Sequence, residues 1–283
     1  MSERDQLYGP LFDYMRRSHG TYMWNLGYWH ADTRSMLDAQ QNLVELCLQA
    51  MSPGEEQRIL EVGCGVGGVL ASMAARHPTC RFVGITVRQQ DVERGARVLG
   101  ELGASGSASI VLGDAQRIPF EDESFDHVLC LESAFHYASK EAFLGEAFRV
   151  LKPGGRLILA DILFRNDTVP LALAQWFCNR SSGQHFRSAQ QWDGLIASSG
   201  FRRAVRFTDF TEFSSPHRPV AASLRSRARA MARRASLPLH MLHWRRGRNE
   251  SGRIVTTLMR WVILRYALWV LERPSMPLPA GHP

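Results

Sequence analysis

Closely spaced glycines follow a short apolar run and form the clearest ligand-binding pattern in the chain. Residues 59–62 are predicted to form a buried strand that contains an acidic residue, Glu61. The glycines that follow are Gly63, Gly65, Gly67 and Gly68. Glycine adopts positive φ angles and lets the main chain approach a ligand closely, and a helix starting near residue 68 would direct its N-terminal N–H groups at that ligand. The segment therefore predicts a nucleotide-binding turn.

Gly63, Gly65 and Gly68 also match the G-x-G-x-x-G pattern of dinucleotide-binding proteins. Such a site needs a carboxylate for the ribose about 20 residues further on. The predicted second strand, residues 81–86, ends in Gly84-Ile85-Thr86 with no carboxylate at its tip. A nicotinamide dinucleotide site is therefore the less favoured interpretation.

Further motifs follow the glycines in a fixed order. They are Gly113-Asp114-Ala115, Ile118-Pro119-Phe120, a strand ending Leu131-Glu132-Ser133, and Leu151-Lys152-Pro153-Gly154-Gly155. This ordered series across residues 56–161 resembles the class I S-adenosylmethionine-dependent methyltransferases, and within them the small-molecule enzymes of natural-product pathways. The resemblance implies an α/β fold with a Rossmann-like, seven-stranded, mostly parallel sheet, helices on both faces and a helical lid.

The chain divides into four predicted parts. They are an N-terminal helical cap over the active site (1–55), a cofactor-binding core (56–212), a basic helical lid (213–260) and a last strand with a tail (261–283). In the core, strands and helices alternate, which indicates a parallel sheet covered on both faces. Residues 189–199 are predicted to be a helix, and 201–210 and 264–271 to be strands. The resemblance implies that these two strands pair antiparallel at the sheet edge.

The N-terminal part is predicted to contain a helix with apolar positions near 3.6-residue spacing, capped by Asp32 or Thr33. Before it lies an aromatic cluster that we assign to the substrate pocket, together with one later tryptophan. These residues are Tyr14, Tyr22, Trp24, Tyr28, Trp29 and Trp176. The segment Asn25-Leu26-Gly27-Tyr28-Trp29 resembles the part of this subgroup that forms the pocket roof. Aromatic residues are also ordinary core residues, so a purely structural role is open for each.

The resemblance implies S-adenosylmethionine as cofactor and gives roles to particular residues. Glu61 takes the ammonium group, Asp114 and the Ala115 amide meet the adenine, and Thr86 and Asp91 serve the ribose. Asp91 stands where the subgroup has glutamine, which changes an amide to a carboxylate that can accept from both hydroxyls. The predicted cofactor-binding residues are Glu61, Gly63, Cys64, Gly65, Gly67, Thr86, Asp91, Asp114, Ala115 and Leu131.

Glu132 and His136 follow the fourth predicted strand, where open α/β sheets bind ligands. The resemblance implies that His136 takes the proton of the acceptor, and a neutral imidazole suits general-base work near neutral pH. Asp161, at the end of the fifth predicted strand, could orient that imidazole. The alternative is that His136 only lines the pocket, because in-line methyl transfer depends mainly on alignment.

We therefore predict an enzyme that methylates a hydroxyl oxygen of a small, largely apolar secondary metabolite. One alternative is methylation of carbon on an isoprenoid or polyketide, with Glu132 stabilising positive charge and the basic lid holding a diphosphate. Another is a relative that keeps the cofactor but catalyses cyclisation. The acceptor and the oligomeric state cannot be inferred from the sequence.

The net charge of +7 is unevenly distributed. Residues 202–265 hold fifteen arginines against three carboxylates, and residues 224–235 form a predicted amphipathic helix with a basic face. That face is either solvated or contacts an anionic membrane or a carrier protein. No nucleic-acid-binding motif accompanies it, so nucleic acid is not an expected partner. The five cysteines and ten histidines show no metal-binding spacing, and free thiols without a signal peptide or membrane span predict a cytoplasmic protein.

Overall fold

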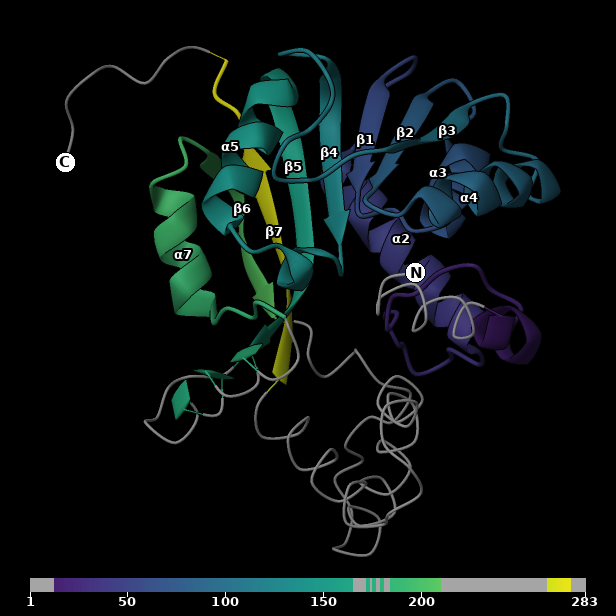
Figure 1. The fold of residues 1–283 in the computed structure, drawn as a ribbon, viewed down its shortest axis with the longest axis horizontal. Coiled ribbons are helices and arrows are strands. Elements are labelled where there is room, and N and C mark those ends of the chain that lie inside the picture. Colours follow the sequence, from purple (N-terminus) through teal and green to yellow (C-terminus); the bar gives the residue numbers. More distant parts are fainter. Residues whose placement is uncertain are drawn as a thin grey trace, which may run out of the picture.

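The computed structural model describes residues 13–164, 172–173, 175–176, 179–180, 184–209 and 264–275. One seven-stranded sheet runs through the molecule in the order β3-β2-β1-β4-β5-β7-β6 (Figure 1). The strands are β1 (Arg58–Val62), β2 (Arg81–Thr86), β3 (Ala108–Leu112), β4 (Phe125–Leu131), β5 (Leu151–Phe164), β6 (Arg202–Asp209) and β7 (Leu264–Glu272). β1 to β5 are parallel, whereas β7 pairs antiparallel with both β5 and β6. The predicted Rossmann-like sheet is thus confirmed, including its antiparallel edge.

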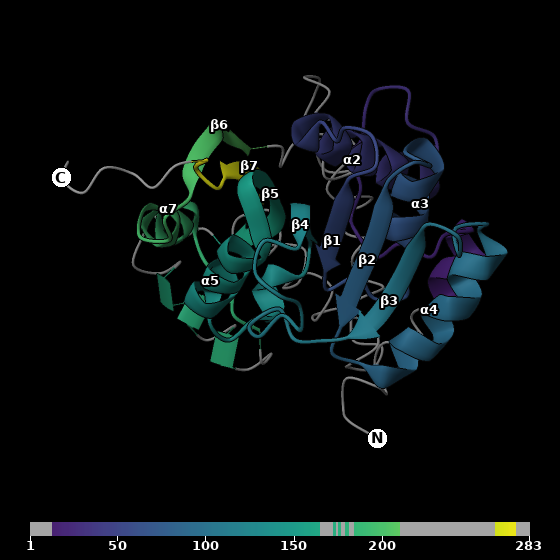
Figure 2. The same cartoon turned by 90° about the horizontal axis from the view of Figure 1, so that it is seen from above.

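Helices cover both faces of the sheet (Figure 2). They are α2 (Met36–Met51), α3 (Gly68–Arg76), α4 (Gln89–Glu101), the 3₁₀ turn η1 (Ala134–His136), α5 (Lys140–Val150) and α7 (Ala189–Ala197). Successive strand residues point to opposite faces. Ile59 packs in the apolar cluster of α2 and α3, and its neighbour Leu60 packs in that of α5 and α7. A sheet that is apolar on both faces needs both helical layers to bury it.

Most of the predicted boundaries of strands and helices agree with the structure to within a few residues, but the predicted N-cap of α2 is wrong. Ser35, rather than Asp32 or Thr33, is its N-cap. The Ser35 hydroxyl accepts from the Asp38 backbone N–H, and the Asp38 carboxylate accepts from the Ser35 N–H, both at 3.0 Å. This reciprocal capping box satisfies two N–H groups at once, which neither predicted cap does.

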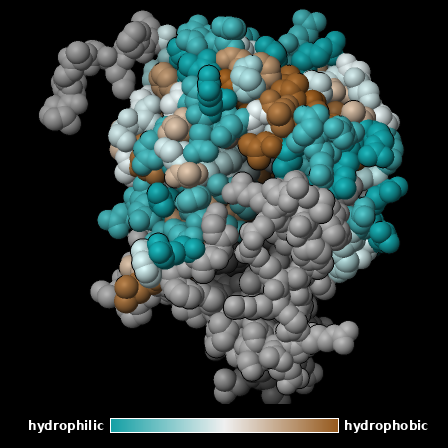
Figure 3. Space-filling model, in the orientation of Figure 1, coloured by the Kyte–Doolittle hydropathy of each residue, from teal (hydrophilic) through white to brown (hydrophobic). Residues whose placement is uncertain are grey.

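The order of the strands fixes the position of the site. β1 lies between β2 and β4; the chain runs on from β1 to β2 and from β4 to β5, so the connections from the carboxyl ends of β1 and β4 leave in opposite directions. Ligands bind in the crevice that such a switch point creates. The surface seen in Figure 3 is mainly hydrophilic, with apolar residues gathered in one area over β1 and β2.

The predicted basic lid, residues 213–260, lies outside the described residues. In the ranges that the structure describes, no helix is both long enough and apolar enough to cross a membrane. Cys47, Cys64, Cys80 and Cys130 are free and buried.

Candidate active site

The glycine turn after β1 is shaped by steric requirements that differ from glycine to glycine. Gly63 has φ +73°, and a Cβ there would lie 2.5 Å from the Cβ of Ser133. Gly65 has φ +54°, and its Cβ would meet only Trp24, at 3.8 Å. A Cβ at Gly68 would lie 2.5 Å from the carbonyl oxygen of Tyr22. Gly63 and Gly68 therefore allow close packing of the chain, whereas Gly65 leaves space open.

Gly67, predicted to contact the cofactor, has a different role. A Cβ there would lie 2.7 Å from Ile110 Cδ1 and 3.3 Å from Leu99 Cδ2, and the residue does not line the cavity described below. Gly67 is the N-cap of α3, and its φ is +85°. Gly67 thus lets α3, α4 and β3 pack together.

A cavity opens at the carboxyl ends of β1, β2 and β4. Ten of the predicted cofactor-binding and catalytic residues line it. They are Glu61, Gly63, Cys64, Gly65, Thr86, Asp91, Ala115, Leu131, Glu132 and His136. Asn25, from the predicted pocket roof, and Gly68, from the glycine turn, also line it, together with residues that were given no role: Met23, Val66, Val69, Ile85, Val87, Arg88, Gly113, Ser133 and Tyr137. The structure therefore brings the glycine turn and the loop of His136 to one cavity.

Glu61 supplies a buried acid to this cavity. Its residue is 2% exposed, and Oε2 has no hydrogen-bond partner within the described chain. Burial raises the pKa of the Glu61 carboxyl to about 8, because an isolated charge is poorly solvated there. A cationic ligand group beside Glu61 would stabilise the ionised form.

The end of β2 supplies an ion pair. Arg88 Nη1 lies 3.4 Å from Asp91 Oδ2, and both side chains are mostly buried. Both residues line the cavity beside Thr86. Arg88 holds the carboxylate of Asp91 in place. Sequence reasoning missed Arg88, because a buried arginine and an exposed arginine before a helix have the same local sequence pattern.

The loop between β3 and β4 closes one side of the cavity with Gly113 and Ala115. Asp114, predicted to meet the adenine, is exposed, does not line the cavity, and accepts from the backbone N–H of Gln116 at 2.9 Å. The structure therefore brings Ala115 to the cavity but not Asp114.

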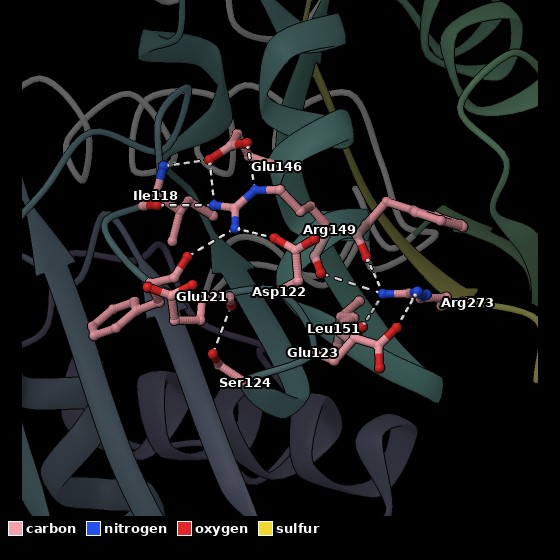
Figure 4. A network of polar contacts seen from close by, with 11 residues as sticks. Ile118, Glu121, Asp122, Glu123, Ser124, Glu146, Arg149, Leu151 and Arg273 are labelled. Atoms are coloured by element: carbon pink, nitrogen blue, oxygen red, sulfur yellow. Dashed lines mark hydrogen bonds and ion pairs between the residues drawn. The ribbon is translucent and has the colours of Figure 1, made fainter.

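Two arginines hold this loop against α5 and the end of β7 (Figure 4). Arg149 donates to the carbonyl oxygen of Ile118 at 3.0 Å and to Glu146, which accepts the Ile118 N–H at 2.7 Å. Arg273 donates to Glu123 at 2.7 Å. Because these hydrogen bonds fix the loop at several atoms, Ala115 is held in place although the loop between β3 and β4 contains no helix.

Residues 22–25 of the N-terminal segment line the cavity, and the segment is held from α2. Gln40 is fully buried, and its Nε2 donates to the carbonyl oxygens of Met23 at 3.1 Å and Asn25 at 2.8 Å. The Gln40 Oε1 accepts from the Thr21 hydroxyl at 2.7 Å. The Tyr22 hydroxyl donates to Glu101 on α4, and this hydrogen bond raises the pKa of Tyr22. The segment is thus fixed to helices on both sides.

Glu132 joins this segment to the sheet. Its Oε1 accepts from the Leu26 N–H at 2.6 Å and from the Tyr266 hydroxyl of β7. Its φ of +48° is unusual for a residue with a side chain and indicates a constrained position. Nearby, Ser133 Oγ donates to the Val62 carbonyl at 2.9 Å and lies 2.7 Å from the Tyr137 hydroxyl. These bonds fix the loop that carries His136.

Asp161, predicted to orient His136, does not line the cavity. It is 1% exposed on β5, and burial raises the pKa of its carboxyl to about 7, opposed by the positive charge of Lys140. Lys140 is also buried and donates to the Tyr137 carbonyl oxygen at 2.6 Å. Asp161 therefore balances the charge of a lysine behind the loop.

Of the aromatic residues predicted to line the substrate pocket, Tyr22 and Trp24 line the cavity. Trp29 instead packs with Met36 and Ala39 and donates from Nε1 to the Leu26 carbonyl. Tyr14 and Tyr28 make edge contacts with histidines, and Trp176 is 63% exposed. The structure therefore does not bring these four to the cavity.

Comparisons with known proteins give the class. Residues 60–159 match the family model described as a methyltransferase domain. The chain is 30% identical over 199 residues to the methyltransferase GfsG of Streptomyces halstedii, covering 69% of this chain and 70% of that one. It is 30% identical over 207 residues to the O-methyltransferase resE of Aspergillus sclerotiorum, covering 72% and 76%. The chain belongs to the S-adenosylmethionine-dependent methyltransferases.

Solved structures agree on the fold. The [4+2]-cyclase SpnF has a TM-score of 0.72 at 22% identity, over 97% of this chain and 96% of that one. The geranyl diphosphate C-methyltransferase of Streptomyces coelicolor A3(2), solved with S-adenosyl-L-homocysteine, has a TM-score of 0.72 at 15% identity, over 93% and 92%. At these identities the likeness establishes the fold alone.

The cavity fits S-adenosylmethionine as cofactor. The ammonium and sulfonium groups of this cofactor are cationic, and Glu61 offers a buried carboxyl whose ionised form such a cation would stabilise. Gly65 leaves open the space that a side chain would fill. The carboxylate of Asp91, held by Arg88, can accept from hydroxyl groups of a sugar.

Proposed function

We propose that this methyltransferase acts on a hydroxyl oxygen of a small, largely apolar secondary metabolite in the cytoplasm. The observation that carries the proposal is the position of His136, on the turn after β4, in the same cavity as the glycine turn and Glu61. An imidazole there is available to an acceptor beside the cofactor. The name of the relative resE, an O-methyltransferase, supports transfer to oxygen.

When bound, S-adenosylmethionine would supply an electrophilic methyl group for in-line transfer to the nucleophile. An imidazole nitrogen of His136 takes the hydroxyl proton as the oxygen attacks, a contribution of roughly 10²–10⁴-fold in general-base catalysis. Glu132 positions the wall of the cavity by holding Leu26, and Tyr22 and Trp24 form apolar wall for the acceptor.

The test is a panel of hydroxylated polyketides, terpenoids and aglycones incubated with S-adenosylmethionine, with methylated products located by mass spectrometry. With an accepted substrate, His136→Ala should lower kcat by about one to three decades and leave the affinity for S-adenosylhomocysteine near the wild-type value. The variant should also lose the rise of the wild-type rate with pH. A variant with near-normal kcat would mean that alignment alone supplies the rate.

A second candidate is methylation at carbon, because the Glu132 carboxylate lies in the same cavity and could stabilise positive charge in an isoprenoid or polyketide acceptor. The two candidates differ in one measurement. Tandem mass spectrometry of the product distinguishes a methoxy group from a new carbon–carbon bond. Formation of a ring without methyl transfer would instead support a cyclase.

A further inference from the structure

Helix α5 begins with only half of a capping box. The hydroxyl of its N-cap, Ser139, accepts from the backbone N–H of Ala142 at 3.0 Å. In a complete box the side chain of the third helical residue also accepts from the N–H of the N-cap, as Asp38 does in α2 and Gln191 in α7. The third residue of α5 is Ala142, whose side chain has no acceptor. The half-buried N–H of Ser139 therefore needs a partner from elsewhere in the chain.

Gln116 supplies this partner from the loop between β3 and β4. Its Oε1 accepts from the Ser139 N–H at 2.7 Å. Its Nε2 donates to Asp114 Oδ1 at 3.3 Å, and the same oxygen accepts from the Gln116 N–H at 2.9 Å. The carboxylate needs a donor and the Ser139 N–H needs an acceptor, so one orientation of the amide satisfies both. Asp114 thus holds the amide of Gln116 with its oxygen facing α5.

The hydrogen bond between Gln116 and Ser139 joins two loops that line the cavity. Ala115, adjacent to Gln116, lines it and is 4% exposed. His136 and Tyr137, shortly before Ser139, line it as well. Neither Gln116 nor Ser139 lines the cavity, so their bond connects the two loops without contact with a bound ligand.

The turn that carries His136 is therefore held on both sides. Before the turn, Ser133 Oγ donates to the carbonyl oxygen of Val62 at 2.9 Å, which attaches it to β1. After the turn, Ser139 donates to Gln116, which attaches it to the loop after β3. Attachment on both sides matters for catalysis, because a displacement of about 1 Å between reacting groups can lower a rate by roughly 10²-fold.

We propose that Gln116 is a positioning residue that couples the occupied cofactor site to the turn of His136. A ligand against Ala115 orders the loop of Gln116. The ordered amide then holds the Ser139 N–H, and with it the start of α5 and the turn before it. The proposal rests on S-adenosylmethionine as cofactor and is independent of whether oxygen or carbon is methylated.

Hydrogen–deuterium exchange of residues 138–142 measures this coupling, because these residues do not line the cavity. Saturating S-adenosylhomocysteine should slow exchange in residues 113–118 directly, and in residues 138–142 by at least about threefold through Gln116. Gln116→Leu removes the acceptor and keeps a side chain of similar size. In this variant the slowing of residues 113–118 should remain and that of residues 138–142 should disappear.

A second substitution separates coupling from simple capping of α5. Loss of the acceptor in Gln116→Leu should lower Tm by about 2–4 °C. Adding Ala142→Glu completes the capping box within α5, because the new carboxylate accepts from the Ser139 N–H. The double variant should regain the Tm of the wild type but not the slowing of residues 138–142 by the ligand.

The matched control is Gln49→Leu. Gln49 lies on α2, donates to Glu45 at 3.1 Å and does not line the cavity. Its replacement also removes a glutamine hydrogen bond at a helix surface, but not one that joins two loops. This variant should show the same slowing as the wild type in both segments.

Three results would overturn the proposal. Equal slowing of residues 138–142 in the wild type and in Gln116→Leu would mean that the ligand acts on α5 through His136 and Tyr137 directly. No slowing of residues 138–142 in the wild type would mean that the loops are not coupled. Recovery of the slowing together with Tm in the double variant would mean that Gln116 only caps the helix.

Failure of the cofactor and failure of the proposed acceptor have different signatures in this test. Absence of slowing in residues 113–118 of the wild type would refute the cofactor site, and the role of Gln116 with it. Absence of a methylated product, with both segments slowed, would refute the proposed acceptor and support the role of Gln116.

Discussion

The backbone N–H of Leu26 donates to the carboxylate of Glu132 across 2.6 Å, and this bond joins the N-terminal segment to the end of β4. The same carboxylate oxygen accepts from the Tyr266 hydroxyl on β7. Segments from the beginning, the middle and the end of the chain therefore meet at one partly buried side chain. Because one of its carboxylate oxygens accepts both bonds, Glu132 is a positioning residue: it holds the N-terminal segment and β7 at the end of β4.

Glu132→Ala should therefore destabilise the fold by about 1–3 kcal/mol, because the Leu26 N–H and the Tyr266 hydroxyl lose their acceptor. Glu132→Gln keeps an oxygen that can accept both bonds and should remain within about 1 kcal/mol of the wild type. Urea unfolding of both variants provides the measurement. Equal losses for Ala and Gln would show that the negative charge, rather than the accepted bonds, holds these segments.

The two glycines of the turn should respond differently to a methyl group. Gly63→Ala forces a Cβ to within 2.5 Å of Ser133 and should disturb folding itself. Gly65→Ala meets only Trp24, at 3.8 Å, so the protein should fold, and the affinity for S-adenosylhomocysteine should fall by about tenfold, or 1.4 kcal/mol. Thermal unfolding and calorimetry separate the two effects.

Gly103→Ala is the control for backbone strain in both variants. Gly103 has φ +71°, has nothing within 4 Å of its Cβ position and does not line the cavity. It should lose about 1 kcal/mol of stability from the left-handed conformation, without any loss of ligand affinity. If Gly65→Ala binds as tightly as Gly103→Ala does, the turn does not contact the cofactor.

The sheet and the glycine turn could be predicted because their signals are local. Apolar strands, the glycines after β1 and the Lys152–Gly155 motif each occupy a few consecutive residues, and their order defines the topology; the predicted turn at this motif is part of β5 instead. The cap of α2 was wrong for a reason also readable in the sequence: Ser35 and Asp38 have the spacing of a capping box, which outweighs Asp32 or Thr33.

The positions of the side chains, in the cavity or in the core, could not be predicted in the same way. Trp24 lines the cavity and Trp29 packs against α2, although both are aromatic residues of one short segment. The burial of Asn25, whose carbonyl oxygen accepts from Gln40, and of Lys140, whose charge interacts with Asp161, depends on contacts between segments far apart in the chain. A single sequence carries no signal for such contacts.

Ligand affinity should depend on pH through Glu61. The pKa of its carboxyl is about 8 in the free protein, and a cation bound beside it favours the ionised form. Binding therefore releases protons, and the affinity for S-adenosylhomocysteine should rise from about pH 6 to pH 8, by at most tenfold per pH unit. Calorimetry in buffers of different ionisation enthalpy measures the released protons. Glu61→Gln should flatten the profile, and a wild-type profile that is already flat would contradict this role.

The free energy of unfolding of the free protein should also depend on pH through Glu61, but it should fall as the pH rises, whereas the ligand affinity increases. The folded pKa of Glu61, about 8, lies above the usual value of 4.5, so between these values the folded state binds more protons than the unfolded state. This contribution to stability is present below about pH 4.5 and is lost as the pH rises towards 8. Glu61→Gln should therefore gain stability relative to the wild type as the pH increases over this window, measured by urea unfolding. A difference between the two proteins that does not change with pH would mean that Glu61 keeps an ordinary pKa.

The buried charges of Lys140 and Asp161 should depend on each other. Burial lowers the pKa of Lys140 to about 8 and raises that of Asp161 to about 7, while each charge favours the ionised form of the other. Lys140→Met removes both this positive charge and the donor to the Tyr137 carbonyl. Near pH 8 it should cost about 3–5 kcal/mol, because the buried carboxylate of Asp161 is left without compensation.

Adding Asp161→Asn to Lys140→Met should restore part of that loss, since the double variant has no buried charge to compensate. The loss in Lys140→Met should also shrink as the pH falls, because removal of the Lys140 charge raises the pKa of Asp161 further and protonation then neutralises the carboxyl. Urea unfolding of the two single variants and the double variant, at about pH 6 and pH 8, completes the cycle. Strictly additive losses at both pH values would mean that the two charges do not interact, and that Lys140 stabilises the loop through Tyr137 alone.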